Sequence, residues 1–375
     1  MGRADRGDAD RPRRPHGDHQ QLPRRADHRS DVTVIAAVLQ APRRLELLAR
    51  PAPLARRGEA VVRIAATAVC HTDLEIYTGR HPGVRLPVVM GHEATGVVEA
   101  IGEGVERLSP GQPVLLNPII ACGDCDACAR GHGNLCRNAG LFGREMDGSL
   151  AEQVVLPERY LYPLPKHVPL AAATLIETLA TVRHAQLRAR IASGESVVVL
   201  GQGVAGLLHT QLAGLSGARP VVAVSRSAGK LELARRRGAD RVVNAAREDV
   251  VAAVMDATAG RGADVVVESA GDPGLITPAI EMLAPGGRLL VYGISHRPVP
   301  EFTTFPLYFK ELTIHGSRAL TPDDVPPAID LVASGAVAVE ELITASYPLE
   351  RVAAAFQEYE RAADSVLRLV IVPGR

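Results

Sequence analysis

Four of the chain's five cysteines stand in one short array, Cys122-x2-Cys125-x2-Cys128-x7-Cys136. The segment around them is rich in Gly, Asp and Asn, so it lacks an apolar core and a metal can supply its folding energy. Four thiolates at this spacing are typical of closed, tetrahedral zinc sites. We therefore expect these four cysteines to hold a structural zinc ion. A free-thiol cluster, a redox centre and an iron–sulfur site are the alternatives.

The fifth cysteine belongs to a different pattern. Cys70 begins a Cys-His-Thr-Asp segment, and His92 and Glu93 lie in a Gly-His-Glu segment further along. A thiolate, an imidazole and a carboxylate form an open site, which leaves one coordination position for water or substrate. We expect Cys70 and His92 to bind a second, catalytic zinc ion. Glu93 and Glu177 are the candidates for the remaining protein position.

An open zinc site of this kind can activate an alcohol. Zinc stabilises the alkoxide, so a bound alcohol becomes more acidic and can release a hydride to a nicotinamide ring. Thr72 follows the first ligand by two residues and can pass on the hydroxyl proton. Asp73 is a candidate for orienting the ring of His92.

A glycine fingerprint follows an apolar strand. Residues 197–200 read Val-Val-Val-Leu and lead into Gly201-x-Gly203-x-x-Gly206, after which a helix is expected. These glycines allow a tight turn, close approach of a pyrophosphate and close packing of helix on strand. The helix that begins at Val204 would direct its N-terminal amides at the phosphates. The pattern therefore predicts a dinucleotide site; a glycine turn without a ligand is the alternative.

The end of the next strand bears on the choice of cofactor. An NAD enzyme usually has an acidic residue there to bind the ribose hydroxyls. This chain has Ser225 followed by Arg226, and an arginine can pair with a 2′-phosphate. We therefore favour NADP(H), with NAD(H) as the alternative, and include Lys230 among the residues expected to contact the cofactor. Arg226 as an ordinary surface arginine is the competing interpretation.

The pattern of apolar runs changes along the chain. Residues 33–65 alternate short apolar runs with Pro- and Arg-rich breaks, which indicates strands, and the cysteine array is expected on a loop between strands. Residues 171–190 have helical spacing. From 197 to 316 strands and helices alternate, which predicts an α/β fold with a parallel sheet covered on both faces. The mixed pattern after 316 indicates that the chain leaves the β-rich part and returns to it.

Composition excludes some classes of partner. The 42 basic and 42 acidic residues cancel, which argues against nucleic-acid binding. Apolar runs are too short to predict a membrane span. Thiols in metal-ligand patterns, without a signal-peptide pattern, favour the cytoplasm. Residues 1–31 have almost no large apolar side chains, and we expect a disordered tail.

Together, these motifs resemble the zinc-containing medium-chain dehydrogenases, the family of alcohol, sorbitol and threonine dehydrogenases, over residues 33–375. The resemblance implies a GroES-like catalytic domain (32–178, then 317–375) split around a Rossmann domain (179–316), with the active site in the cleft. It implies that Cys70 and Thr72 supply a zinc ligand and the proton-relay hydroxyl. It also implies two zinc ions per chain and a homodimer or homotetramer.

Two positions depart from many members of that family. The chain has no sixth cysteine for the third catalytic ligand. Instead, the segment around Glu177 resembles the Glu-Pro-Leu segment of the sorbitol and threonine branch, which favours polyols, amino alcohols or other polar secondary alcohols as substrates. The position where many members end the proton relay with histidine is Glu75 here. Two other functions stay open: an enone or quinone reductase of the same fold, and a non-catalytic zinc-binding protein.

Overall fold

The computed structural model describes residues 32–362 and 365–374, so the expected tail at 1–31 lies outside the described residues. One part of the molecule is a six-stranded, all-parallel sheet. Its strands follow the order of a Rossmann sheet, 3-2-1-4-5-6 in chain order. In space they are β13 (Arg241–Asn244), β12 (Val221–Ser225), β11 (Val197–Leu200), β14 (Ala263–Glu268), β15 (Leu283–Val291) and β16 (Thr313–Gly316).

Helices cover both faces of this sheet, as the continuous apolar strands require. On one side Val197 and Val199 pack in a cluster with alanines of the helices α4 and α5, while Val198 and Leu200 face the α7–α8 side. The helices are α4 (Ile176–Ala189), α5 (Val204–Leu215), α6 (Ala228–Arg236), α7 (Val250–Ala257), α8 (Ile276–Met282) and α9 (Phe305–Phe309). The expected α/β class with a Rossmann sheet is confirmed.

The second part is β-rich and is built mainly on a seven-stranded sheet. Its main path runs β10 (Leu161–Pro163), β6 (Pro113–Leu116), β5 (Glu93–Ile101), β3 (Glu59–Val69), β18 (Arg368–Val372) and β17 (Ile343–Pro348), and β9 (Gln153–Pro157) also pairs with β3. Smaller sheets are β2 (Arg44–Pro51), β1 (Thr33–Ala41) and β4 (Val88–Val89), and the pair β7 (Ile119–Ile120) and β8 (Gly140–Leu141). The last two long strands, β17 and β18, thus come from the C-terminal end of the chain, which returns to this part.

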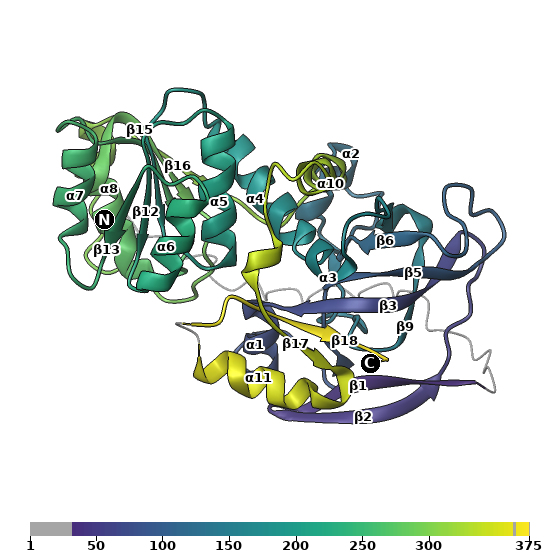
Figure 1. Ribbon diagram of the computed structural model, residues 1–375. Helices are drawn as coiled ribbons and strands as arrows, with labels where there is room; N and C mark the ends of the chain where they lie inside the picture. Colours follow the sequence, from purple (N-terminus) through teal and green to yellow (C-terminus); the bar gives the residue numbers. More distant parts are fainter. Residues whose placement is uncertain (1–31, 363–364, 375) are drawn as a thin grey trace, which may run out of the picture.

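Helix α4 joins the two parts (Figure 1). It packs against α5 and β15 on the Rossmann side, and against β5, β6 and α10 (Val325–Ala333) on the other. Ile176 and Leu179 of this helix, and Leu175 directly before it, are fully buried in a core shared by both parts. Side chains on α4 are therefore held rigidly where the β-rich sheet meets the nucleotide fold.

Local structure differs from the expectation at two places. The cysteine array is not purely a loop, because it contains α2 (Asp126–Ala129) and the 3-10 turn η1 (Gly133–Leu135). The expected single helix over 171–190 is two helices, α3 (Leu170–Ala173) and α4, with a break at 174–175. Within the described residues no helix is long and apolar enough to cross a membrane.

Candidate metal and cofactor sites

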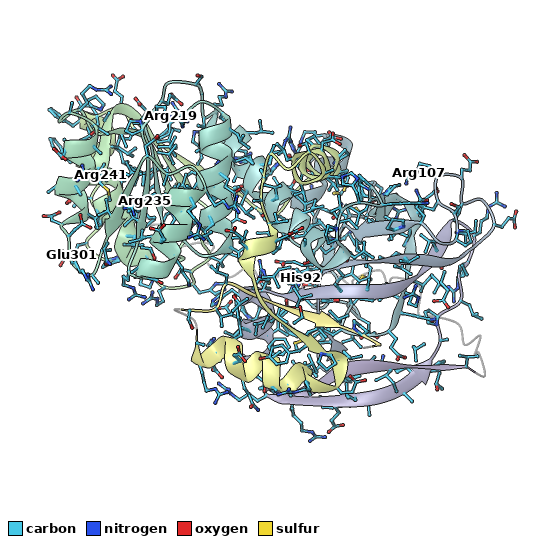
Figure 2. The ribbon with its side chains drawn as sticks, in the orientation of Figure 1. His92, Arg107, Arg219, Arg235, Arg241 and Glu301 are labelled. Carbon is cyan, nitrogen blue, oxygen red and sulfur yellow. The ribbon has the colours of Figure 1, made fainter. Side chains whose placement is uncertain are left out.

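His92 lies in the β-rich part, close to where it meets the nucleotide fold (Figure 2), and the side chain of Cys70 converges on it. The Cys70 sulfur lies 3.1 Å from His92 Nε2, and both residues are buried. Ligand atoms of Cys70, His92 and Asp73 all lie within 4.8 Å of one another. A tetrahedral zinc ion would hold a sulfur and a ring nitrogen about 3.6 Å apart. The pair therefore needs to open only slightly to accept the ion.

Local folding explains why these groups meet. Cys70 is the N-cap of α1 (His71–Thr78), and the Cys70 amide donates to Asp73 Oδ2 at 3.0 Å. The other carboxylate oxygen, Asp73 Oδ1, lies 3.2 Å from His92 Nδ1. One carboxylate oxygen of Asp73 therefore caps the N-terminus of α1, and the other lies beside the His92 ring, where it could orient that ring. Burial works to lower the pKa of His92, but the Asp73 carboxylate raises it well above its usual value.

Glu93 does not stand free beside these ligands, because it is paired with a residue from the other end of the chain. Arg368 Nη2 on β18 lies 3.1 Å from Glu93 Oε1, and the Thr178 hydroxyl donates to the same oxygen at 3.0 Å. Arg368 also donates to the Thr178 hydroxyl and to the Val69 carbonyl, both at 3.1 Å. Sequence reasoning missed Arg368 and Thr178; the available signal was one arginine at the start of the apolar run Arg-Leu-Val-Ile-Val.

The site as a whole has an excess of buried acidic groups. Burial and the neighbouring Glu93 carboxylate raise the pKa of Glu177 to about 8, and burial raises the pKa of the Cys70 thiol. Glu93 Oε2 is buried and has no hydrogen-bond partner among the described residues. The buried carboxylates and the thiol outnumber the positive groups that face them, the Arg368 guanidinium and the His92 ring. A divalent cation would supply the missing positive charge, so the residues present fit zinc.

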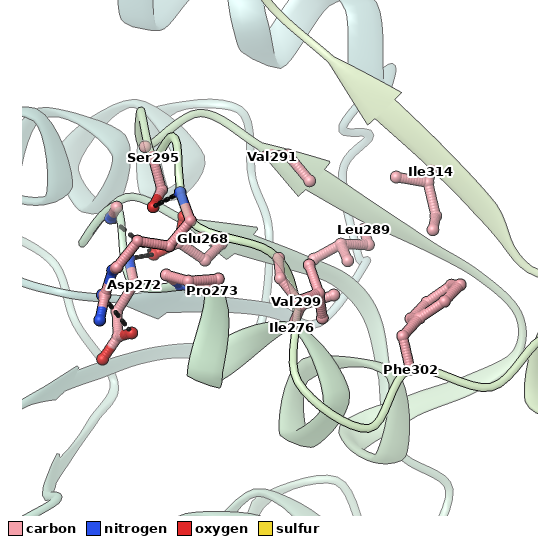
Figure 3. Close-up of a pocket in the computed structure, with 13 residues that line it drawn as sticks. Glu268, Asp272, Pro273, Ile276, Leu289, Val291, Ser295, Val299, Phe302 and Ile314 are labelled. Carbon is pink, nitrogen blue, oxygen red and sulfur yellow. Dashed lines mark hydrogen bonds and ion pairs between the residues drawn. The ribbon is translucent and has the colours of Figure 1, made fainter.

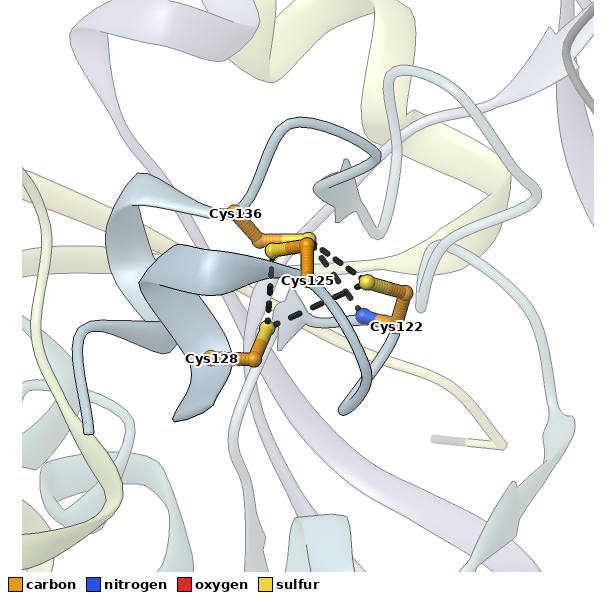
Figure 4. A group of neighbouring side chains, drawn as sticks. All are labelled: Cys122, Cys125, Cys128 and Cys136. Carbon is orange, nitrogen blue, oxygen red and sulfur yellow. Dashed lines mark hydrogen bonds between the residues drawn. The ribbon is translucent and has the colours of Figure 1, made fainter. Parts of the chain in front are cut away.

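The four remaining cysteines form one cluster (Figure 4). Four sulfurs at tetrahedral zinc bond lengths would lie about 3.8 Å apart. The sulfur–sulfur distances are 3.4 Å (Cys122 to Cys136), 3.5 Å (Cys125 to Cys128) and 3.9 Å (Cys122 to Cys128, and Cys125 to Cys136). The cluster therefore has the size and donor set of a closed four-thiolate zinc site.

The thiols of this cluster differ in acidity. Backbone amides of Cys128 and Arg137 lower the pKa of Cys125 to about 6, whereas a hydrogen bond with the Asp124 side chain raises the pKa of Cys122 to about 12. The lowered pKa favours the thiolate form of Cys125 over that of Cys122. Since metal ligation requires deprotonated sulfur, Cys125 is the natural first ligand.

The glycine fingerprint has the geometry that a dinucleotide requires. Gly201 follows β11 with φ of +92°, a conformation that favours glycine. A Cβ on Gly206 would stand 1.9 Å from the Gly201 carbonyl oxygen, so α5 can approach the turn only with glycine there. Gly203 is the N-cap of α5, and a Cβ added to it would meet no atom within 4 Å. The space in front of the Val204 helix terminus is thus open for a phosphate.

The residues expected at the ribose lie at the carboxyl end of the sheet. Ser225 is the last residue of β12, and its hydroxyl accepts the Ser227 amide at 3.2 Å. Arg226 is exposed, and Lys230 lies on the first turns of α6, partly buried. The glycine turn, Ser225 and Arg226 therefore all lie at one edge of the sheet, where nucleotides bind in such folds.

Helix α4 connects this edge to the metal site. Tyr292 directly follows β15, and its hydroxyl lies 2.6 Å from Thr181 Oγ1, one turn along α4 from Glu177. The Thr181 hydroxyl donates to the Thr178 carbonyl at 2.8 Å, so the Tyr292 hydroxyl is the donor to Thr181. A cofactor that extends from the glycine turn along this edge would therefore come close to α4, which carries the candidate ligand Glu177.

The two residues expected to move protons lie on α1. Thr72 is partly buried next to Cys70. The Glu75 side chain is 24% exposed and lies 3.8 Å from the ring of His71, which is 70% exposed. Glu75 thus lies beside an imidazole that is exposed to solvent.

A separate cavity of about 430 Å³ lies on the α8 face of the Rossmann sheet (Figure 3). Its apolar floor includes Leu289, Val291 and Ile314, and Asp272 at its rim pairs with Arg297 at 3.1 Å. Beside it, large apolar side chains are exposed: Ile294, Phe305, Tyr308 and Phe309. This surface is adjacent to β16, which among the described residues pairs only with β15.

Comparison with known proteins identifies the family. Residues 56–166 match the alcohol dehydrogenase GroES-like domain, and residues 205–334 match the zinc-binding dehydrogenase domain. L-threonine 3-dehydrogenase of Pyrococcus horikoshii is 36% identical over 321 residues, which cover 84% of this chain and 90% of that protein. D-xylulose reductase A of Aspergillus oryzae is 33% identical over 336 residues, which cover 86% and 93%.

A solved structure extends the likeness to three dimensions. A zinc-binding dehydrogenase from Sinorhizobium meliloti, bound to NADP, superposes with a TM-score of 0.86 at 30% identity and covers 92% of this chain and 100% of that one. The chain belongs to the zinc-containing medium-chain dehydrogenase/reductase family. It is an oxidoreductase of the alcohol, polyol and amino-alcohol class, and its domains and cysteine cluster fit zinc and NAD(P) as cofactors.

Proposed function

We propose that this enzyme transfers a hydride between a polar secondary alcohol, such as a polyol or amino alcohol, and NADP, giving the corresponding carbonyl compound. The observation that carries this proposal is the convergence of Cys70 and His92 beside buried carboxylates, one of which, Glu177, lies on the helix α4 that packs against the nucleotide fold. A zinc ion bound there would supply Lewis-acid chemistry to the substrate oxygen. Cys70 and His92 would hold the ion, with Glu177 or Glu93 at the third position.

The carboxylates at the site support a polar substrate. Glu177 and Glu93 are both buried, and the Arg368 pair holds Glu93 in place. Carboxylates that are not engaged by the metal can accept hydrogen bonds from additional hydroxyl or ammonium groups of a substrate. The similar proteins of known name include a threonine dehydrogenase and a D-xylulose reductase, which fits an amino alcohol or a polyol here.

Proton release is proposed to run along α1. The Thr72 hydroxyl would take the alcohol proton, and Glu75 would pass it to solvent beside His71. Substituting Glu75→Gln should lower the rate of alcohol oxidation near neutral pH, because the amide cannot accept a proton. A pH–rate profile identical to that of the parent enzyme would remove Glu75 from the route.

Assembly is proposed to be homodimeric, with dimers of dimers as the larger form. The edge of β16 and the exposed side chains of Ile294, Phe305, Tyr308 and Phe309 would be covered by a second copy. Substituting Ile314→Lys on β16 should yield monomers in sedimentation analysis if this edge is the interface.

We also propose the division into catalytic (32–178 and 317–375) and Rossmann (179–316) domains, and a cytoplasmic location.

The first test is absorbance at 340 nm with purified, zinc-loaded protein. NADP+ and NAD+ are offered separately with simple alcohols, polyols and amino alcohols. Reduction of NADP+ with a polar secondary alcohol is the expected result. Turnover with NAD+ alone would overturn the cofactor assignment but keep the hydride transfer, whereas turnover of an enone and not of any alcohol would favour the reductase alternative.

A further inference from the structure

The lobe that carries the four clustered cysteines is tied to the segment that directly follows β16, the edge strand of the Rossmann sheet, by a reciprocal pair of hydrogen bonds. Asn134 Nδ2, in η1, donates to the Arg318 carbonyl at 2.8 Å. The Arg318 guanidinium donates back to the Asn134 carbonyl, also at 2.8 Å. Asn134 is only 4% exposed and lies two residues before Cys136. The Asn134 side of the contact is therefore buried, whereas Arg318 is exposed, and Asn134 belongs to the same turn as the clustered Cys136.

Arg318 occupies a place that matters for the cofactor. It is the second residue after β16, the edge strand of the parallel sheet. The carboxyl end of β16 is at the same edge as the glycine turn, and nucleotides bind in the crevice outside that edge. The segment 317–319 thus lies on the carboxyl side of the sheet, the side on which the glycine turn lies, and Asn134 of the β-rich part holds it there.

The segment also has two features of a ligand-holding turn. Ala319 has φ of +51°, a backbone conformation that alanine rarely adopts. Such strain persists only when surrounding contacts determine the conformation, and it is concentrated at ligand clamps. The Ser317 hydroxyl oxygen is buried and has no hydrogen-bond partner among the described residues. The segment therefore combines a left-handed backbone at Ala319 with a buried hydroxyl oxygen that a ligand could satisfy.

A second set of contacts fixes the segment that follows. Asn134 Nδ2 lies 3.4 Å from His184 Nε2 on α4, and His184 Nδ1 lies 2.9 Å from Asp324 Oδ2. Asp324 also accepts bonds from Arg183 at 2.8 Å and from the Thr321 hydroxyl at 2.7 Å. The cysteine lobe, α4 and the connection from β16 to α10 therefore form one hydrogen-bonded unit around Asn134.

We propose that the cysteine lobe acts, through Asn134, as a positioning element for the cofactor: it holds the strained segment 317–319 in the conformation that binds the nucleotide. This inference rests on the proposed cofactor site. Its consequence is that disrupting the folded cysteine lobe should weaken cofactor binding as well as lower the stability of the protein. By thermodynamic reciprocity, cofactor binding also stabilises the lobe.

The test is a direct binding measurement with Asn134→Ala, using the fluorescence of NADPH and no substrate. The dissociation constant should rise roughly tenfold while the metal content stays that of the parent protein. The matched control is Asn138→Ala, in the same lobe but with an exposed side chain, which should leave the constant unchanged. An unchanged constant in Asn134→Ala, with only a lower melting temperature, would overturn the proposal.

A measurement on the unaltered protein covers the case in which Asn134→Ala fails to fold. Amide hydrogen exchange of residues 122–138 is followed with and without saturating NADPH. Slower exchange with cofactor is the expected result, and equal exchange overturns the proposal. If the unaltered protein binds neither NADPH nor NADH, the proposed cofactor site is wrong and this inference falls with it. If the unaltered protein binds cofactor but residues 122–138 exchange equally with and without it, only this inference is wrong.

Discussion

Arg368 and Glu93 form a buried ion pair, with 3.1 Å between Nη2 and Oε1 and side chains that are 5% and 4% exposed. The two residues come from opposite ends of the chain and meet because β18 lies beside β3, which pairs with β5. The pair engages one oxygen of Glu93, the residue that directly follows the expected zinc ligand His92. The C-terminal strand therefore completes a site whose other residues come from the first half of the chain.

Replacing Arg368 should strongly destabilise the protein. Arg368→Met would leave Glu93 buried without its partner, which costs about 3–5 kcal/mol in the free energy of unfolding. The control is Arg57→Met, whose pair with Glu103 is exposed (78% and 80%) and contributes at most about 1 kcal/mol. Urea denaturation of the two variants measures the difference. Similar losses in both would contradict a structural role for the buried pair.

The two cysteine sites should respond separately to substitution. Cys70→Ser should remove one zinc ion per chain and abolish turnover, because the soft ligand of the open site is lost. Cys136→Ser should remove the other ion and lower the melting temperature, because the lobe depends on metal for its folding energy. Metal analysis by mass spectrometry of both variants checks this. Loss of both ions in each variant would show that the sites are not independent.

Arg226 should determine the cofactor preference. Without the guanidinium, a 2′-phosphate loses a charge-assisted contact of about 1.5–3 kcal/mol, so Arg226→Ala should raise KM for NADP+ roughly tenfold or more. KM for NAD+ should change little. Arg235→Ala, on the exposed side of α6 where it pairs with Glu232, is the matched control. Equal effects on both cofactors would mean that Arg226 is an ordinary surface residue.

Asp324 should contribute to stability in a pH-dependent way. Burial works to raise its pKa, but hydrogen bonds from His184 and Thr321 outweigh burial and hold the pKa below its usual value. A lowered pKa means that the stabilisation is full above the unfolded value of about 3.9 and is lost as pH falls through the folded value. Asp324→Asn should therefore be less stable than the parent at pH 7.

Denaturation across a pH series checks this prediction. The difference between Asp324→Asn and the parent in the free energy of unfolding should narrow as pH falls below about 4, because the Asp324 carboxylate then binds a proton in the unfolded state before it does so in the folded state. Asp323→Asn changes the exposed neighbouring carboxylate and should show no such trend. A difference that stays constant down to pH 2 would mean that Asp324 acts through its shape and not its charge.

Some features could be predicted from sequence because their determinants are local. The cysteine spacing places four sulfurs within bonding reach of one ion, and the fingerprint at Gly201 needs only a strand, a turn and a helix in succession. The capping of α1 by Cys70 and Asp73 is also local, although the helix itself was not anticipated. Family and reaction class followed from these motifs, and the comparisons confirm them.

Other features were decided only by the tertiary structure. The pairing of Arg368 with Glu93 depends on which strands become neighbours, and the bond between Asn134 and Arg318 depends on how the cysteine lobe packs against the end of β16. No periodicity in the chain encodes these contacts, because each joins two segments that are far apart in the sequence. Which distant segments meet is decided when the intervening sheets and helices pack. Motif spacing therefore determined which chemical groups this protein carries. Sheet order and domain packing determined which of them are buried, paired and held in place.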